Sequence, residues 1–109
     1  MLTIFKKLFS NKGYRNLRST EFLAEYQATP GAVLLDVRTP GEVAAGKLKN
    51  ALNIDFRNPS FDAKIEKLDR EKSYFLYCRS GVRSANACKK MHKMGFTKLV
   101  NLSGGYISI

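Results

Sequence analysis

The chain has 109 residues, of which 44% are hydrophobic and 26% charged, and it carries a formal charge of +10. This length permits one domain with its own core and excludes two, and no run of residues approaches the roughly 20 apolar residues of a membrane-spanning helix. Two cysteines without a CxxC pair exclude a disulfide scaffold and argue against a zinc site, which fits a reducing compartment such as the cytoplasm. We further expect a monomer with no integral membrane association.

The first predicted element is a short amphipathic helix over residues 1–9, where large apolar side chains recur at helical spacing. It belongs to a basic N-terminal segment, residues 1–13, which precedes a domain over residues 14–109. Two roles are open for this helix. It packs on the domain, or it binds a membrane surface or a partner.

The rest of the chain alternates helices with strands. Capping residues and apolar side chains at helical spacing predict helices over residues 20–28, 40–45, 60–68 and 82–94. Short apolar runs bounded by turn residues predict strands over residues 32–37, 51–54, 73–78 and 96–102. This alternation predicts an α/β fold, in which a parallel sheet is covered by helices on both faces.

The positive charge gathers at the two ends of the chain. Residues 1–18 hold five cations and no acid, and residues 72–109 hold seven cations and no acid. One interpretation is a set of solvated surface charges, and the other is a field that attracts anions. Nucleic acid is disfavoured as that anion, because no helix-turn-helix, RNA-binding aromatic motif or zinc finger accompanies the charge. If nucleic acid did bind, the candidate contacts would be residues 1–18 together with Lys89, Lys90, Lys93 and Lys98.

The segment Cys78-Arg79-Ser80-Gly81-Val82-Arg83 carries the clearest chemical signal. It lies where a predicted strand passes into a predicted helix, at the edge where open α/β sheets bind ligands. Free N–H groups at a helix start and two nearby arginines favour an anion there, and such surroundings lower the pKa of a thiol. We therefore expect Cys78 to be a thiolate. Cys88 lies in the middle of the same predicted helix and is expected in the core, with a resolving or regulatory thiol as the alternative.

Four motifs between about Tyr14 and Gly105 resemble the single-domain rhodanese, or sulfurtransferase, family. In chain order they are LLDVRTPGE at residues 34–42, GKLKNALNI at 46–54, YCRSGVRS at 77–84 and GFTKLVNLSGG at 95–105. Each motif alone is weak evidence, but four in order at the family's spacing are specific. The sequence departs from the family's usual pattern at Lys47, where His is common, and at Ile109, where Trp is common.

The resemblance implies a three-layer α/β/α fold around a central, mainly parallel five-stranded sheet, with no metal and no cofactor. It implies that Cys78 accepts a sulfane sulfur as a persulfide and passes it to cyanide or a thiol. Asp36, Arg38 and Glu42 would form an ion-pair network that supports the loops of the site. The residues that would bind the sulfur and an anionic donor such as thiosulfate are Arg79, Ser80, Gly81, Val82 and Arg83.

The length of the cysteine loop favours sulfur transfer over phosphoryl transfer. Related phosphatases and arsenate reductases place one more residue between Cys and Arg than the four found here. Tyr77 stands where those phosphatases have His, and no acidic residue follows Glu71. The leading interpretation is a sulfurtransferase that takes a small anionic donor and serves a small or an acidic protein acceptor. The alternative is a non-catalytic module of the same fold that binds or regulates a partner.

Overall fold

A five-stranded sheet in which all neighbouring strands are parallel forms the centre of the computed structural model, which describes residues 12–109. The strand order is β1-β5-β4-β2-β3. The strands are β1 (Arg15–Leu17), β2 (Val33–Asp36), β3 (Leu52–Asn53), β4 (Tyr74–Tyr77) and β5 (Leu99–Leu102). The predicted parallel sheet of five strands is therefore confirmed. The helix predicted over residues 1–9 lies outside the described residues.

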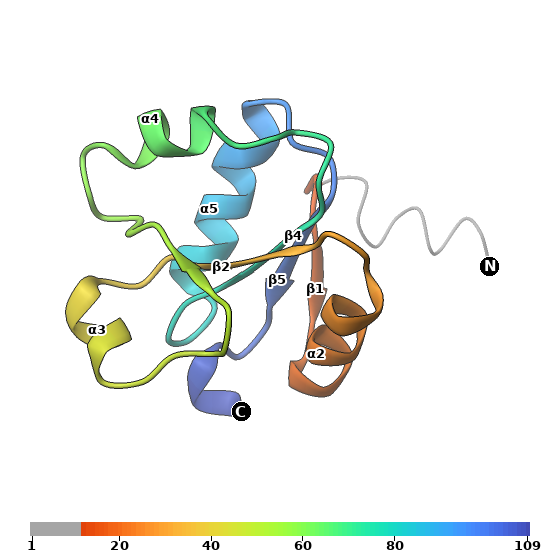
Figure 1. Cartoon of the computed structure of the whole chain (residues 1–109), viewed down its shortest axis with the longest axis vertical. Helices are drawn as coiled ribbons and strands as arrows, with labels where there is room; N and C mark the ends of the chain where they lie inside the picture. Colours follow the sequence, from red (N-terminus) through yellow and green to blue (C-terminus); the bar gives the residue numbers. More distant parts are fainter. Residues whose placement is uncertain (1–11) are drawn as a thin grey trace.

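Helices cover both faces of the sheet, so the three-layer arrangement is confirmed as well. Figure 1 shows α4 and α5 on one side of the strands and α2 on the other. The helices are α2 (Ser19–Ala28), α3 (Pro40–Ala44), α4 (Phe61–Glu66), α5 (Val82–Lys93) and the 3-10 helix η1 (Tyr106–Ser108). Between residues 12 and 109, none of them is long and apolar enough to cross a membrane.

The core consists of two clusters because side chains alternate between the two faces of a strand. In β4, Tyr74 and Leu76 join the cluster beneath α4 and α5, which also contains Cys88. Phe75 joins the cluster beneath α2, where Phe22 meets it edge to face with ring centroids 5.5 Å apart. Cys88 is fully buried, which confirms its predicted place in the core.

One strand escaped the sequence analysis and another was predicted too long. No strand was predicted before residue 19, since β1 has three residues and is not an apolar run. It forms because β5 offers an unpaired edge, against which Arg15 aligns with Val100 and Leu17 with Leu102. The strand predicted over residues 96–102 begins only at Leu99, because the Phe96 N–H bonds back to the Met91 carbonyl in α5 and residues 96–98 form no regular structure.

Candidate active site

Cys78 lies directly after β4, at the carboxyl edge of the sheet, in the loop that leads into α5 (Figure 1). Its side chain is only 1% exposed. The loop turns sharply because Gly81 has a φ of +102°, a conformation that favours glycine. The turn brings the N–H of Gly81 to 3.1 Å from the Cys78 sulfur. The loop therefore folds around the thiol rather than extending away from it.

Several hydrogen-bond donors converge on the sulfur. The N–H and the hydroxyl of Ser84 each lie 3.4 Å from Sγ, in addition to the N–H of Gly81. Burial is the largest single influence and raises the pKa of the Cys78 thiol. The hydrogen bonds from Ser84, Gly81 and the N–H of Ser80 together outweigh burial, so the pKa lies below its ordinary value. The site favours a thiolate, which is the nucleophilic form of cysteine.

Ser84 was not among the predicted site residues, although it lies in one of the quoted motifs. The available signal was its place in the first turn of α5, six residues after Cys78. Cys88 provides the contrast within the same helix. Burial without compensating donors raises the pKa of its thiol well above the ordinary value, so this cysteine stays uncharged.

The segment that follows β5 holds the cysteine loop from outside. The N–H of Tyr106 donates to the carbonyl of Cys78 at 2.8 Å, and the N–H of Ile107 donates to that of Arg79 at 3.2 Å. Two glycines permit this close approach. A Cβ on Gly81 would lie 3.2 Å from the backbone of the opposite segment, and a Cβ on Gly105 would overlap the carbonyl of Arg79. The GG pair of the closing motif is thus a contact surface for the loop.

Asp36 and Arg38 form a buried ion pair, with Nη2 and Oδ2 2.7 Å apart. The hydroxyl of Tyr77 donates to the same carboxylate at 2.7 Å, which joins the end of β2 to the end of β4. The Arg38 guanidinium also donates to the carbonyl of Gly46 at 2.7 Å and lies over the ring of Tyr106, 4.4 Å from its centroid. Hydrogen bonding to Asp36 raises the pKa of Arg38 despite burial. This cluster connects three segments that surround the cysteine loop.

Glu42 and Arg83 form a second pair, at the start of α3 and α5. Two parallel hydrogen bonds of 2.8 Å join the Arg83 nitrogens to the Glu42 carboxylate. Hydrogen bonding to Arg83 is the main reason why the pKa of Glu42 falls to about 2. Arg38 reaches only the backbone carbonyl of Glu42, at 3.5 Å. The three residues predicted to support the site thus belong to two separate ion pairs, Asp36 with Arg38 and Glu42 with Arg83. The second pair occupies the guanidinium that the resemblance assigned to binding an anionic sulfur donor.

Hollows flank the cysteine loop on both sides. On one side, Arg79 lines a hollow of about 400 Å³ together with Ile107 and Ile109. On the other side, Ser80, Gly81 and Val82 line a more open hollow. Within residues 12–109, the Arg79 side chain forms no ion pair or hydrogen bond, whereas that of Arg83 is paired. Residues of the cysteine loop, though not Cys78 itself, therefore line hollows on both of its flanks.

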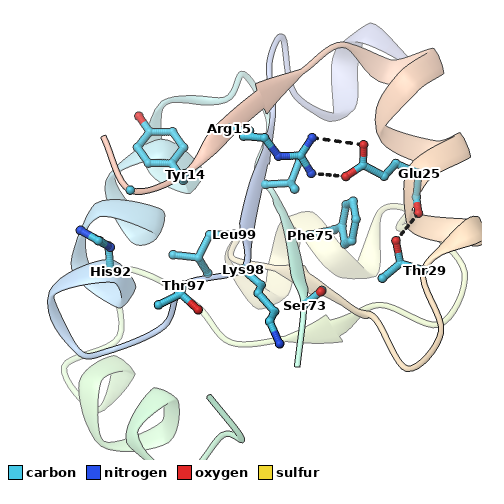
Figure 2. A pocket seen from close by; sticks show the side chains of 12 residues that line it. Tyr14, Arg15, Glu25, Thr29, Ser73, Phe75, His92, Thr97, Lys98 and Leu99 are labelled. Carbon is cyan, nitrogen blue, oxygen red and sulfur yellow. Dashed lines mark hydrogen bonds and ion pairs between the residues drawn. The ribbon is translucent and has the colours of Figure 1, made fainter. Parts of the chain in front are cut away.

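A further hollow, of about 470 Å³, lies at the opposite, amino edge of the sheet. Figure 2 shows Ser73 and Lys98 at its wall and the guanidinium of Arg15 directed at the carboxylate of Glu25. Neither cysteine lines this hollow. In the described part of the chain, no group of three or more His, Cys, Asp or Glu residues could hold a metal ion. Cys78 therefore lies at the edge of the sheet opposite to this hollow.

Comparison with known sequences points to one family. A family model described as Rhodanese-like domain matches residues 19–108. The protein "Putative sulfurtransferase YtwF" of Bacillus subtilis (strain 168) is 42% identical over 91 residues, which cover 83% of this chain and 85% of that protein. The protein "Sulfurtransferase" of Allochromatium vinosum is 32% identical over 80 residues, 73% of either protein. A tRNA uridine(34) hydroxylase of Cytophaga hutchinsonii is 34% identical over 96 residues, but only 30% of its length is matched.

Solved structures show the same similarity. The crystal structure of a rhodanese-like domain protein from Staphylococcus aureus has a TM-score of 0.75 at 25% identity, covering 85% of this chain and 88% of that one. A rhodanese-related protein from Thermoplasma volcanium has a TM-score of 0.72 at 29% identity, covering 84% and 86%. The similarity extends over nearly the whole of the described chain.

Proposed function

We propose, since this chain belongs to the rhodanese-like domain family, that it is a sulfurtransferase that carries a sulfane sulfur on Cys78. The observation that carries the proposal is the convergence of donors from Gly81 and Ser84 on a buried sulfur. Donors in this arrangement stabilise negative charge on the thiolate. Backbone N–H groups of the same loop are candidates to stabilise the charge of an additional sulfur atom as well.

In the first half of the reaction, the Cys78 thiolate attacks the sulfane sulfur of the donor. With thiosulfate, a bond forms between the two sulfur atoms, the S–S bond of thiosulfate breaks, and sulfite leaves with the bonding electrons. Cys78 then carries a persulfide. The N–H groups of residues 79–83 are the candidates that hold its terminal sulfur.

In the second half, an acceptor nucleophile attacks the terminal sulfur of the persulfide. The bond within the persulfide breaks, its electron pair returns to Cys78 as a thiolate, and the acceptor leaves with the sulfur. Cyanide gives thiocyanate, and a thiolate gives an organic persulfide. No oxidant or reductant is consumed, because the sulfane sulfur carries its oxidation state with it.

The lowered pKa of Cys78 favours this function over a non-catalytic binding module, since partner binding alone does not need a stabilised thiolate. The tight loop supports sulfur transfer over phosphoryl transfer, because its four residues between Cys78 and Arg83 are one fewer than in the related phosphatases and form a smaller cradle. We propose a cytoplasmic location and a small anionic donor, and an acidic protein is a candidate acceptor for the basic residues 72–109.

The test is to incubate the protein with thiosulfate or an organic persulfide and to look by intact mass for one added sulfur atom. Cys78→Ala should abolish the adduct and all transfer to cyanide. The matched control is Cys88→Ala, which removes the other thiol and should leave both intact, with circular dichroism to verify the fold. If reduced wild-type protein acquired no sulfur from either donor, the proposed function would be wrong.

A further inference from the structure

We propose that Glu42 is a specificity-determining residue which, by holding Arg83, makes the site favour a singly charged organic sulfur donor over the dianion thiosulfate. The inference rests on the proposed function and names the class of donor for it. Thiosulfate carries two negative charges and no apolar part. A thiol persulfide carries at most one charge on its reacting group and has an organic stem.

The pairing of Glu42 with Arg83 uses both oxygens of the carboxylate and two nitrogens of the guanidinium, at 2.8 Å each. Glu42 is fixed further by Thr39, whose N–H and hydroxyl lie 3.0 and 3.1 Å from Oε1 in the capping box that begins α3. The side chains of Arg83 and Glu42 are 17% and 27% exposed. A fork-to-fork pair that is largely shielded from water is not readily given up for a dissolved anion.

Arg83 is close enough to Cys78 for their charges to interact, since the charge of Cys78 contributes to the raised pKa of Arg83 after the larger effect of Glu42. An unpaired guanidinium at this place would attract an anionic donor. With Glu42 bound to it, the two charges cancel for a group that approaches from outside the pair. Arg79, which has no ion-pair partner among the described residues, is then the uncompensated cation of the loop.

The hollow beside Arg79 fits an organic stem. Ile107 and Ile109 line it and are 62% and 54% exposed, which is unusual for large apolar side chains. Glu42 lines the same hollow, but its charge is balanced by Arg83, so the pair offers no net attraction to a second negative charge on the donor. One uncompensated cation and an apolar wall together match a donor with one negative charge and an apolar part.

The reaction with such a donor is balanced without a further reagent. The Cys78 thiolate attacks the terminal sulfur of R–S–SH and forms a new S–S bond. The original S–S bond breaks, and R–S⁻ leaves with the electron pair. The proton stays on the transferred sulfur, so Cys78 ends as Cys–S–SH.

The experiment compares two donors of similar size, thiosulfate with two charges and methanethiosulfonate with one charge and a methyl group. Glu42→Gln removes the negative charge but keeps an amide oxygen for the capping box. Because the electrostatic interaction scales with the charge of the donor, a gain of about threefold in kcat/KM for methanethiosulfonate corresponds to about ninefold for thiosulfate. The variant should therefore shift the donor preference toward thiosulfate by about threefold, with cyanide as acceptor for both.

The double variant Glu42→Gln with Arg83→Gln replaces the ion pair by two uncharged amides. If the pair is electrically silent in the wild type, the ratio of kcat/KM for thiosulfate to kcat/KM for methanethiosulfonate should stay within about twofold of the wild-type ratio, whatever the change in overall rate. If Arg83 binds the donor directly, this ratio should fall by about threefold or more in the double variant, because the dianion loses more attraction than the monoanion. This variant leaves no unpaired charge, so it remains informative if the single variant does not fold.

Glu25→Gln is the matched control, since it adds the same charge by releasing Arg15 at the opposite edge of the sheet. It should leave the donor preference unchanged. An unchanged preference in Glu42→Gln, or a preference in the double variant that shifts away from thiosulfate, would overturn the role of Glu42. Those results presuppose sulfur transfer by the wild type, whereas no transfer from any donor would overturn the proposed function itself.

Discussion

Removal of the Ser84 hydroxyl is predicted to raise the pKa of Cys78 by about one unit. Ser84→Ala loses the hydroxyl bond to Sγ at 3.4 Å and keeps the backbone N–H bond of the same length. Hydrogen bonds to charged groups contribute about 1.5–3 kcal/mol, and the long distance favours the lower limit. Since one pKa unit corresponds to about 1.4 kcal/mol, a loss of about 1.5 kcal/mol gives a rise of about one unit.

The effect of this change on the reactivity of Cys78 reverses with pH. Below both pKa values, the thiolate fraction falls about tenfold, while the higher basicity makes each remaining thiolate about threefold more nucleophilic. Alkylation by iodoacetamide should then slow about three- to fourfold. Above both pKa values every thiol is ionised, and Ser84→Ala should react about threefold faster than the wild type.

The assay is the pH profile of alkylation, followed by mass spectrometry of the peptide that contains Cys78, so that Cys88 does not contribute. Ser80→Ala is the control, because Ser80 influences the sulfur through its backbone N–H, which the substitution retains. Its profile should match the wild type. An unchanged pKa in Ser84→Ala would refute the assigned role of the hydroxyl. Slower alkylation at every pH would show instead that the substitution distorts the loop.

Two further predictions concern the surroundings of the loop. The pKa of Glu42 is lowered from 4.5 to about 2, so its pairing with Arg83 stabilises the fold above pH 4.5 and this contribution is lost as the pH falls toward 2. The free energy of unfolding in urea should therefore fall by about 1–2 kcal/mol more for the wild type than for Glu42→Gln over that pH range, after allowance for the partial exposure of the pair. If the unfolding free energies of the two proteins changed in parallel with pH, the pairing would be contradicted. Gly105→Ala and Gly31→Ala both place alanine at a positive φ, +70° and +72°, but only the Cβ at residue 105 overlaps Arg79. Gly31→Ala should lower the free energy of unfolding in urea by about 1 kcal/mol. Gly105→Ala should lower it by more than about 3 kcal/mol and should also slow sulfur transfer. Equal losses of stability in the two variants would contradict the close approach of Gly105 to Arg79.

Much of the fold follows from local patterns in the sequence. The apolar runs that became β2 and β4 are too short for helices and are bounded by turn residues, so their place in a buried sheet could be predicted. The position of Cys78 between a strand and a helix followed from the same patterns. The pairing of Asp36 with Arg38 was also accessible, since the two residues are separated by one position.

Other features depend on contacts between distant parts of the chain. β1 has no pattern of its own and exists because the edge of β5 accepts it. Arg83 pairs with Glu42, 41 positions earlier, and nothing in the local sequence distinguishes it from Arg79, which has no such partner among residues 12–109. Sequence patterns report interactions between neighbours along the chain, so they placed Cys78 at the end of a strand. Which charges surround that cysteine was decided by the parallel sheet, because it brings the starts of α3 and α5 to the same edge.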